Sequence, residues 1–141
     1  MSATATAADV DLWPEDLEPK GEPSPSAILR QQGYRLGERT GDVVYGEVES
    51  QYENGEFIHT MYVAASYLRV RKPVLQVRHN LALYPATFHF PGTNGEFGRG
   101  VFTANTVDEF REQLREQLRS SDIVWLIQSL IAQARDLDTN E

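Results

Sequence analysis

The dipeptide Asn54-Gly55 constrains the fold of this chain more than any other short segment. Asn and Gly adopt the left-handed backbone conformation readily, and a two-residue turn of this kind joins two antiparallel strands. Residues 42–53 before it place apolar or small side chains on one side and mostly acidic or polar side chains on the other, which predicts a half-buried strand. Residues 56–65 after it are the predicted partner strand. The chain is therefore expected to contain a tight β-hairpin.

The two hairpin strands differ in how their faces are composed. The first puts Val44, Val48 and Tyr52 on one face and Glu47, Glu49 and Glu53 on the other. The second is apolar on both faces, which predicts a central strand that is covered on both sides. Its two predicted faces consist of Phe57, Met61 and Val63 and of Ile58, Tyr62 and Ala64.

Three more strands are expected after the hairpin, at residues 74–79, 86–90 and 97–103. A basic connection, residues 67–73, precedes the first of them, and the turn at residues 91–95 separates the last two. The predicted inward-facing residues are Leu75, Val77, Phe88 and Phe90.

Helices are expected on both sides of these strands. Ser24-Pro25 is a typical helix start. That helix is predicted to run to about residue 39, weakened by Gly33 and Gly37, and to end at Thr40-Gly41. Thr106 and Glu109 form a capping box for a second helix. Ser121-Asp122 is the predicted cap of a third helix, whose wide apolar face predicts that it is the main helix packed on the sheet.

The order of elements predicts an α+β fold, with an N-terminal helix, an antiparallel meander sheet of four to five strands, and two C-terminal helices packed on one face. A chain of 141 residues has room for one ordinary domain. We expect a single domain over residues 24–141 behind a flexible acidic arm, residues 1–23, whose composition is poor in large apolar groups.

Charge is concentrated in this arm. The chain carries a net charge of −8, and residues 1–25 hold six acidic residues against Lys20, which gives −5. Acidic chains do not favour nucleic acid as a partner. Leu12, Trp13 and Leu17 lie among the acids and are predicted to dock on a protein partner. The alternative is that Trp13 packs onto its own domain.

The absence of cysteine excludes disulfides, thiolate metal ligands and a cysteine nucleophile. No secretion signal or membrane-spanning stretch is recognisable, so we expect a cytoplasmic protein with no membrane partner.

Motifs for catalysis are missing. The sequence has no phosphate-binding loop, nucleophile elbow or zincin motif, so no catalytic residue, metal ligand or cofactor is assigned. The remaining candidates are His59, His79 and Tyr84, which could line a pocket on a sheet face. A strand histidine is more often a hydrogen-bonded core residue than a ligand.

Two charged clusters leave alternatives open. Arg69, Arg71 and Lys72 could contact RNA or an acidic protein partner, or hold the chain's own acidic arm as an electrostatic latch. The alternating Glu47, Glu49 and Glu53 could do acid–base work, or form a wet face that protects a sheet edge.

Two stretches, AILRQQGYRLGERT at residues 27–40 and RHNLALYPATFHF at residues 78–90, are similar to small bacterial proteins with no assigned activity. The resemblance covers roughly residues 26–90. It implies a bacterial source and a recurrent domain, and it assigns no site residue.

The leading hypothesis is a noncatalytic protein-interaction module of the immunity-protein, antitoxin, chaperone or adaptor type, since acidic proteins are steered toward basic partners. One alternative is a small-molecule-binding protein or enzyme that uses the sheet face near the two histidines. Another is a structural subunit of a homo-oligomer that pairs through an open sheet edge.

Overall fold

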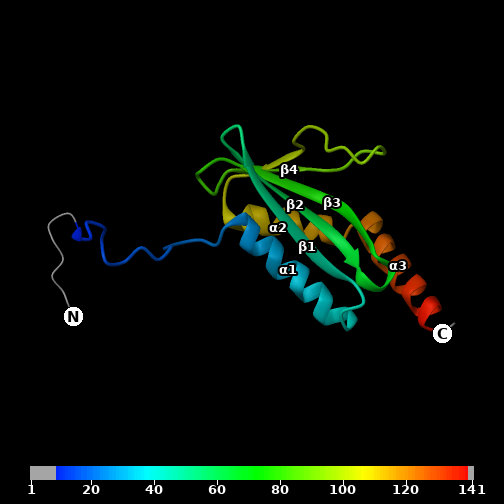
Figure 1. Cartoon of the computed structure of the whole chain (residues 1–141). Coiled ribbons are helices and arrows are strands. Elements are labelled where there is room, and N and C mark those ends of the chain that lie inside the picture. Colours follow the sequence, from blue (N-terminus) through cyan, green and yellow to red (C-terminus); the bar gives the residue numbers. More distant parts are fainter. Residues whose placement is uncertain (1–8, 140–141) are drawn as a thin grey trace, which may run out of the picture.

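The computed structural model describes residues 9–139 and has the predicted α+β architecture. One helix precedes a five-stranded antiparallel meander of order β1-β2-β3-β4-β5, and two helices follow it (Figure 1). The elements are α1 (Pro25–Thr40), β1 (Tyr45–Glu53), β2 (Glu56–Ala65), β3 (Val70–His79), β4 (Ala86–His89), β5 (Phe102–Ala104), α2 (Val107–Leu118) and α3 (Ser121–Thr139).

The hairpin between β1 and β2 forms at the predicted turn. Asn54 and Gly55 have φ angles of 55° and 80°, and Glu53 pairs with Glu56 across the strand ends. This register places the even-numbered residues of β1 toward the helices and its glutamates toward the opposite face of the sheet. The predicted division of β1 into two faces is confirmed.

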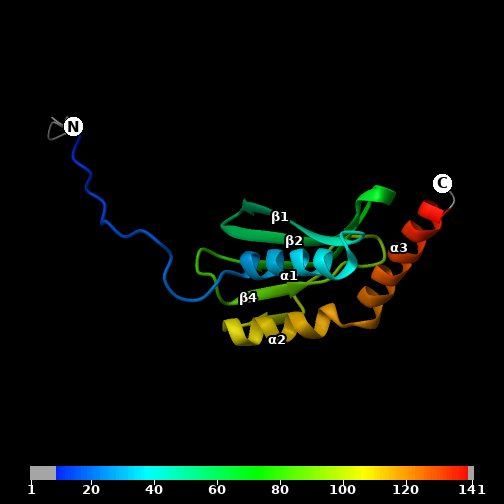
Figure 2. The ribbon, with the colours of Figure 1, turned by 90° about the horizontal axis from the view of Figure 1, so that it is seen from below.

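A single hydrophobic core lies between one face of the sheet and the helices. It joins residues of all three helices to one side of β2, β3, β4 and β5, with Phe88 and Phe110 fully buried at its centre. The views in Figures 1 and 2 place the helices on this side of the sheet only. Strand β2 is buried along most of both faces, but no helix covers its second face. The predicted burial of both faces of this strand is confirmed.

Strand β3 begins at Val70, four residues earlier than predicted. A short 3-10 helix (Ser66–Leu68) and a left-handed Arg69 turn the chain back after β2. The ladder then tolerates Pro73, because the register shifts between Met61 and Tyr62 and leaves an extra residue on β3. Strand β5 is shorter than predicted, since the glycine-rich segment before it makes only a bridge between Pro91 and Phe97.

The helix ends follow local capping signals. The Ser24 hydroxyl accepts a hydrogen bond from the Ala27 N–H at 3.2 Å, and α1 ends at a left-handed Gly41. Thr106 caps α2 in the predicted way, at 3.1 Å from the Glu109 N–H. The cap of α3 is Ser120, whose hydroxyl lies 3.4 Å from the Ile123 N–H, rather than the predicted Ser121-Asp122.

Helix α3 is not the main helix on the sheet, contrary to the prediction. Figure 1 shows α1 lying along the sheet and α3 running out past its end. The side chain of Trp125 is 66% exposed. Part of the apolar face of α3 borders a groove, described below, through Ile123, Val124 and Ile127. None of the helices in the described chain is both long and apolar enough to cross a bilayer.

Helix α1 meets β1 through two glycines. A Cβ added at Gly33 would lie 2.6 Å from the carbonyl oxygen of Gly46, and one added at Gly46 would lie 2.5 Å from the Gly33 Cα. Real side chains do not tolerate such distances, so backbone would have to move. The sequence indicated only that Gly33 weakens the helix. The structure gives it a packing role.

We expect Gly33→Ala to lower the free energy of unfolding by about 1–3 kcal/mol, because it overpacks this contact. Denaturant unfolding followed by circular dichroism measures the effect. Gly98→Ala is the control, because a Cβ there meets nothing within 4 Å and its φ is not left-handed. Equal stability of the two variants would contradict the assigned role of Gly33.

Candidate functional site

The structure brings two of the predicted site residues into direct contact. The Nε2 atoms of His59 and His79 lie 2.9 Å apart, and both rings are buried. The residues sit on β2 and β3, on the core-facing side of the sheet, as the strand pattern predicted. The Phe57 ring stacks on His79 with 5.5 Å between ring centroids and covers the pair.

A chain of hydrogen bonds passes through the pair in one direction. The Asn80 carbonyl can only accept, so the Nδ1–H of His79 donates to it at 2.7 Å. With both rings neutral, the His79 Nε2 then accepts from the His59 Nε2–H. The His59 Nδ1 in turn accepts from the Ser50 hydroxyl at 2.7 Å, and that oxygen accepts from Arg30 at 3.0 Å. The chain ties α1 to β1, β2 and β3.

The environment keeps His59 neutral. Burial lowers its pKa to about 4, and repulsion from a protonated His79 ring and from the Arg30 guanidinium would act in the same direction. A hydroxyl that donates to a histidine resembles the start of a nucleophile–base pair. However, a base with this pKa accepts protons poorly at neutral pH, and Arg30 occupies the same hydroxyl oxygen. The arrangement is better suited to holding the elements together than to proton transfer.

Tyr84 does not join the histidine pair through its hydroxyl. That hydroxyl donates to the Pro23 carbonyl at 3.0 Å, and the Tyr84 ring packs edge-on against Phe110. Burial and the nearby Glu22 raise the pKa of Tyr84 to about 12, while Arg111 acts in the opposite direction. Tyr84 therefore marks the place where the arm, helix α1 and helix α2 meet.

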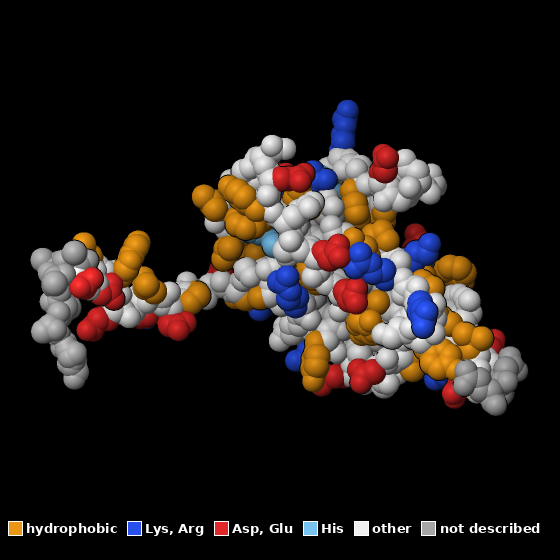
Figure 3. All heavy atoms as spheres, in the orientation of Figure 1, with side chains coloured by type: hydrophobic (Ala, Val, Ile, Leu, Met, Phe, Trp, Pro, Cys, Tyr) orange, Lys and Arg blue, Asp and Glu red, His pale blue; other side chains and the backbone are white. Residues whose placement is uncertain are grey.

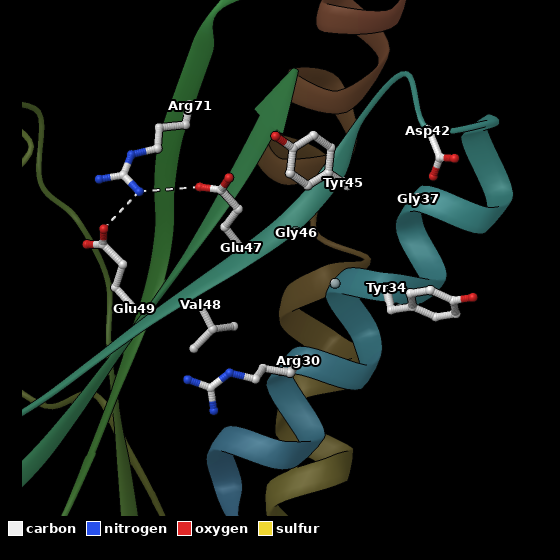
Figure 4. Close-up of a pocket in the computed structure, with 11 residues that line it drawn as sticks. Arg30, Tyr34, Gly37, Asp42, Tyr45, Gly46, Glu47, Val48, Glu49 and Arg71 are labelled. Atoms are coloured by element: carbon white, nitrogen blue, oxygen red, sulfur yellow. Dashed lines mark hydrogen bonds and ion pairs between the residues drawn. The ribbon is translucent and has the colours of Figure 1, made fainter. Parts of the chain in front are cut away.

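The outer face of the sheet carries the predicted glutamate row. Figure 4 shows Arg71 between Glu47 and Glu49, at 3.3 and 3.0 Å, and its guanidinium lies 4.0 Å from the Tyr62 ring centroid. The Arg71 contact lowers the pKa of Glu49. Of the predicted basic patch, Arg71 is thus engaged within the sheet. Its predicted neighbours Arg69 and Lys72 are exposed, and a partner contact there stays a prediction.

A shallow cleft of about 560 Å³ follows the line where α1 meets β1. Arg30 and Tyr34 of α1 border it on one side and Val48 of β1 on another (Figure 4). Side chains of both charge signs line this cleft, because Arg71 and its two glutamates reach its edge. It presents no single charge to a ligand.

A larger groove of about 780 Å³ lies between α1, α2 and the first turns of α3. Buried apolar side chains form its floor, among them Ile28, Met61, Val63 and Leu114. Among the residues that the structure describes, no aspartate or glutamate lines it. Its polar lining includes five arginines: Arg35 and Arg39 of α1, Arg111 and Arg115 of α2, and Arg119, the C-cap of α2. We call this surface the arginine groove.

The arginines are mostly unengaged by carboxylates. Arg115 forms a salt bridge with Glu112 at 3.0 Å, whereas the other four form no ion pair within residues 9–139. Along α2 the arginines alternate with glutamates, a pattern typical of a solvated, charge-paired helix face, and so the sequence did not predict the groove. The available signal was the i, i+4 spacing of the arginines, at 35 and 39 in α1 and at 111, 115 and 119 in α2 and its C-cap.

The predicted docking residues of the arm are fully presented to solvent. Residues 9–23 are exposed throughout, and Figure 3 shows apolar and acidic side chains side by side on the segment that extends from the domain. Leu12, Trp13 and Leu17 are 90%, 74% and 66% exposed. Residues 1–8 of the predicted arm lie outside the described residues.

Neither a metal site nor a similar protein assigns a function to this chain. In the described part of the chain, no three histidine, aspartate or glutamate side chains are placed to share a metal ion. The chain matches no protein-family model, and no curated protein or solved structure is significantly similar to it.

Acidification should destabilise the fold through His59. Its pKa is about 4 in the folded chain and 6.5 for an unperturbed imidazole, so the unfolded chain binds more protons between these values. Stability is therefore lost as the pH falls from 6.5 toward 4. Because the hydrogen-bond chain opens to solvent at Ser50, we expect this loss to be on the order of 1–2 kcal/mol.

Denaturant unfolding at several pH values measures this loss, with His59→Gln as the comparison that lacks the titrating ring. The variant should lose less stability than the parent over the same pH range. Long-range ¹H–¹⁵N NMR checks the assigned tautomers directly. A His59 ring that titrates near pH 6.5, or carries its proton on Nδ1 at neutral pH, would contradict the hydrogen-bond chain described here.

Proposed function

We propose that this protein is a noncatalytic protein-interaction module that binds a protein partner through the arginine groove. The observation that carries the proposal is the pairing of a buried apolar floor with five arginines and no lining carboxylate. A role for this protein as an immunity protein, antitoxin, chaperone or adaptor is compatible with it.

The chemistry of the groove defines the class of segment it would take. Apolar side chains inserted over the floor gain about 25 cal/mol per Å² of apolar surface removed from water. Arginine is enriched in protein interfaces and binds carboxylates through a planar fork of donors. The fitting ligand is thus a short acidic segment with a few large apolar side chains, bound as a helix or an extended strand between α1 and α2.

A small-molecule or enzymatic role is the second candidate, favoured by one observation. The Ser50, His59 and His79 side chains form a continuous hydrogen-bond chain that reaches solvent at Ser50. The low pKa of His59 argues against proton transfer at neutral pH. Labelling of Ser50 by a fluorophosphonate reagent, lost in Ser50→Ala, would favour this second role.

The interaction proposal is tested by charge reversal in the groove. The double variant Arg35→Glu/Arg111→Glu places carboxylates on both walls, and we expect it to weaken retention of a partner about tenfold or more. The measurement is co-purification of tagged full-length chain from its native host, with quantification of each stoichiometric partner.

The matched control is Arg69→Glu/Lys72→Glu, which changes the net charge equally but lies outside the groove. Circular dichroism establishes that both variants are folded. A partner retained equally by the groove variant and the parent, or lost only in the control, would show that the groove is not the binding surface. The latter result would favour the basic patch predicted from the sequence.

A further inference from the structure

We propose that the chain's own acidic arm, residues 9–22, folds back into the arginine groove and competes there with the partner. This inference rests on the proposed function, since it names an occupant of the same groove. The arm extends away from the domain in the structure (Figure 1), so the proposal adds a closed state to the open one seen there.

The arm and the arginine groove are complementary in charge, and both carry apolar side chains. The arm holds six acidic residues and Lys20, a net charge of −5, against the five arginines of the groove. Lys20, the one basic residue of this segment, is paired with Asp16 at 2.7 Å. The exposed Leu12, Trp13 and Leu17 are the large apolar groups that the groove floor would remove from water.

The arm leaves the domain at one end of the groove. The Pro23 carbonyl accepts a hydrogen bond from the Tyr84 hydroxyl. Glu22 and Arg111 both lie close enough to Tyr84 to shift its pKa, in opposite directions. Figure 2 shows α1 and α2 running in the same direction, with their N-terminal ends on the side from which the arm departs. An arm that reverses direction near Pro23 would therefore run along the groove toward its far end.

The arm is long enough to make this contact within one molecule. From Trp13 to Pro23 there are ten residue steps, which can span up to about 33 Å. The groove follows α1 from Ile28 to Thr40, a helical rise of about 18 Å. A flexible tether of this length gives an effective concentration on the order of millimolar, so even weak intrinsic binding fills the groove.

The other charged surfaces of the domain suit the arm less well. On the outer face of the sheet, Arg71 is neutralised by Glu47 and Glu49, whose carboxylates would also repel an acidic segment. The α1–β1 cleft shares these same glutamates. Of the predicted latch site, Arg69 and Lys72 remain as candidates. Neither residue lines one of the two clefts described above, so they offer no apolar floor to the arm. In the closed state, an incoming partner must displace the arm, which limits binding to segments that compete with it.

Fluorescence of Trp13 tests the closed state in the full-length chain. The chain has two tryptophans, so Trp125→Phe leaves Trp13 as the only one, and Trp125 does not line the groove. We expect acrylamide to quench Trp13 several-fold less in this parent than in the same chain with Arg35→Glu/Arg111→Glu. Salt at about 1 M, which shortens the Debye length to about 3 Å, should expose Trp13 in the parent.

The control is again Arg69→Glu/Lys72→Glu, which should leave Trp13 protected. Equal quenching in all three chains would overturn the proposal, as would exposure of Trp13 by the control variant. Protection should be unchanged over about a hundredfold range of protein concentration, as an intramolecular contact requires. Protection that increases with concentration would mean that the arm of a second copy fills the groove, and would overturn the intramolecular form proposed here.

A second measurement separates failure of this inference from failure of the proposed function. A fluorescein-labelled peptide of residues 9–22 is titrated into the parent chain and into full-length Leu12→Ala/Trp13→Ala/Leu17→Ala. Several-fold tighter binding to the variant supports competition by the arm. Equal binding to both chains overturns the closed state and leaves the groove as a binding surface. Binding to neither chain overturns both proposals.

Discussion

The contact between Gly33 and Gly46 is the constraint on which the rest of this structure depends. Only residues without a side chain let α1 approach β1 so closely. This approach puts Arg30 within hydrogen-bond reach of Ser50, and so connects α1 to the buried histidine pair. It also fixes the wall of the groove that carries Arg35 and Arg39. The site and the fold therefore share one packing interaction.

Local signals were sufficient for the fold and insufficient for the groove. The Asn54-Gly55 turn, the alternation of β1 and the caps at Ser24 and Thr106 each act within a few residues, and each was predicted correctly. The bulge beside Pro73 and the outward course of α3 depend on which segments meet in space. The groove is of this second kind, because its walls are separated by about seventy residues of sheet.

Positive and negative charges are unevenly distributed over the surfaces of this protein. A net charge of −8 suggests a uniformly acidic protein, but residues 1–25 carry −5 of this net charge and five arginines line the groove. On the sheet's outer face, Arg71 is paired with two glutamates, which leaves one net negative charge there. This distribution places an acidic segment with exposed apolar side chains and an arginine-lined apolar groove in one molecule. The histidine pair, which the sequence offered as a pocket, supports the scaffold between them.

The central claim is that the arginine groove recognises an acidic segment with large apolar side chains. Because the chain has no cysteine, a nitroxide can be attached to a single cysteine added to a peptide of residues 9–22. Paramagnetic broadening is then measured on the ¹⁵N-labelled full-length chain with Leu12, Trp13 and Leu17 replaced by alanine. The account predicts broadened amides along α1 and α2, around Arg35 and Leu114, and unaffected amides around Tyr62. Broadening confined to the sheet's outer face, or none at all, would contradict it.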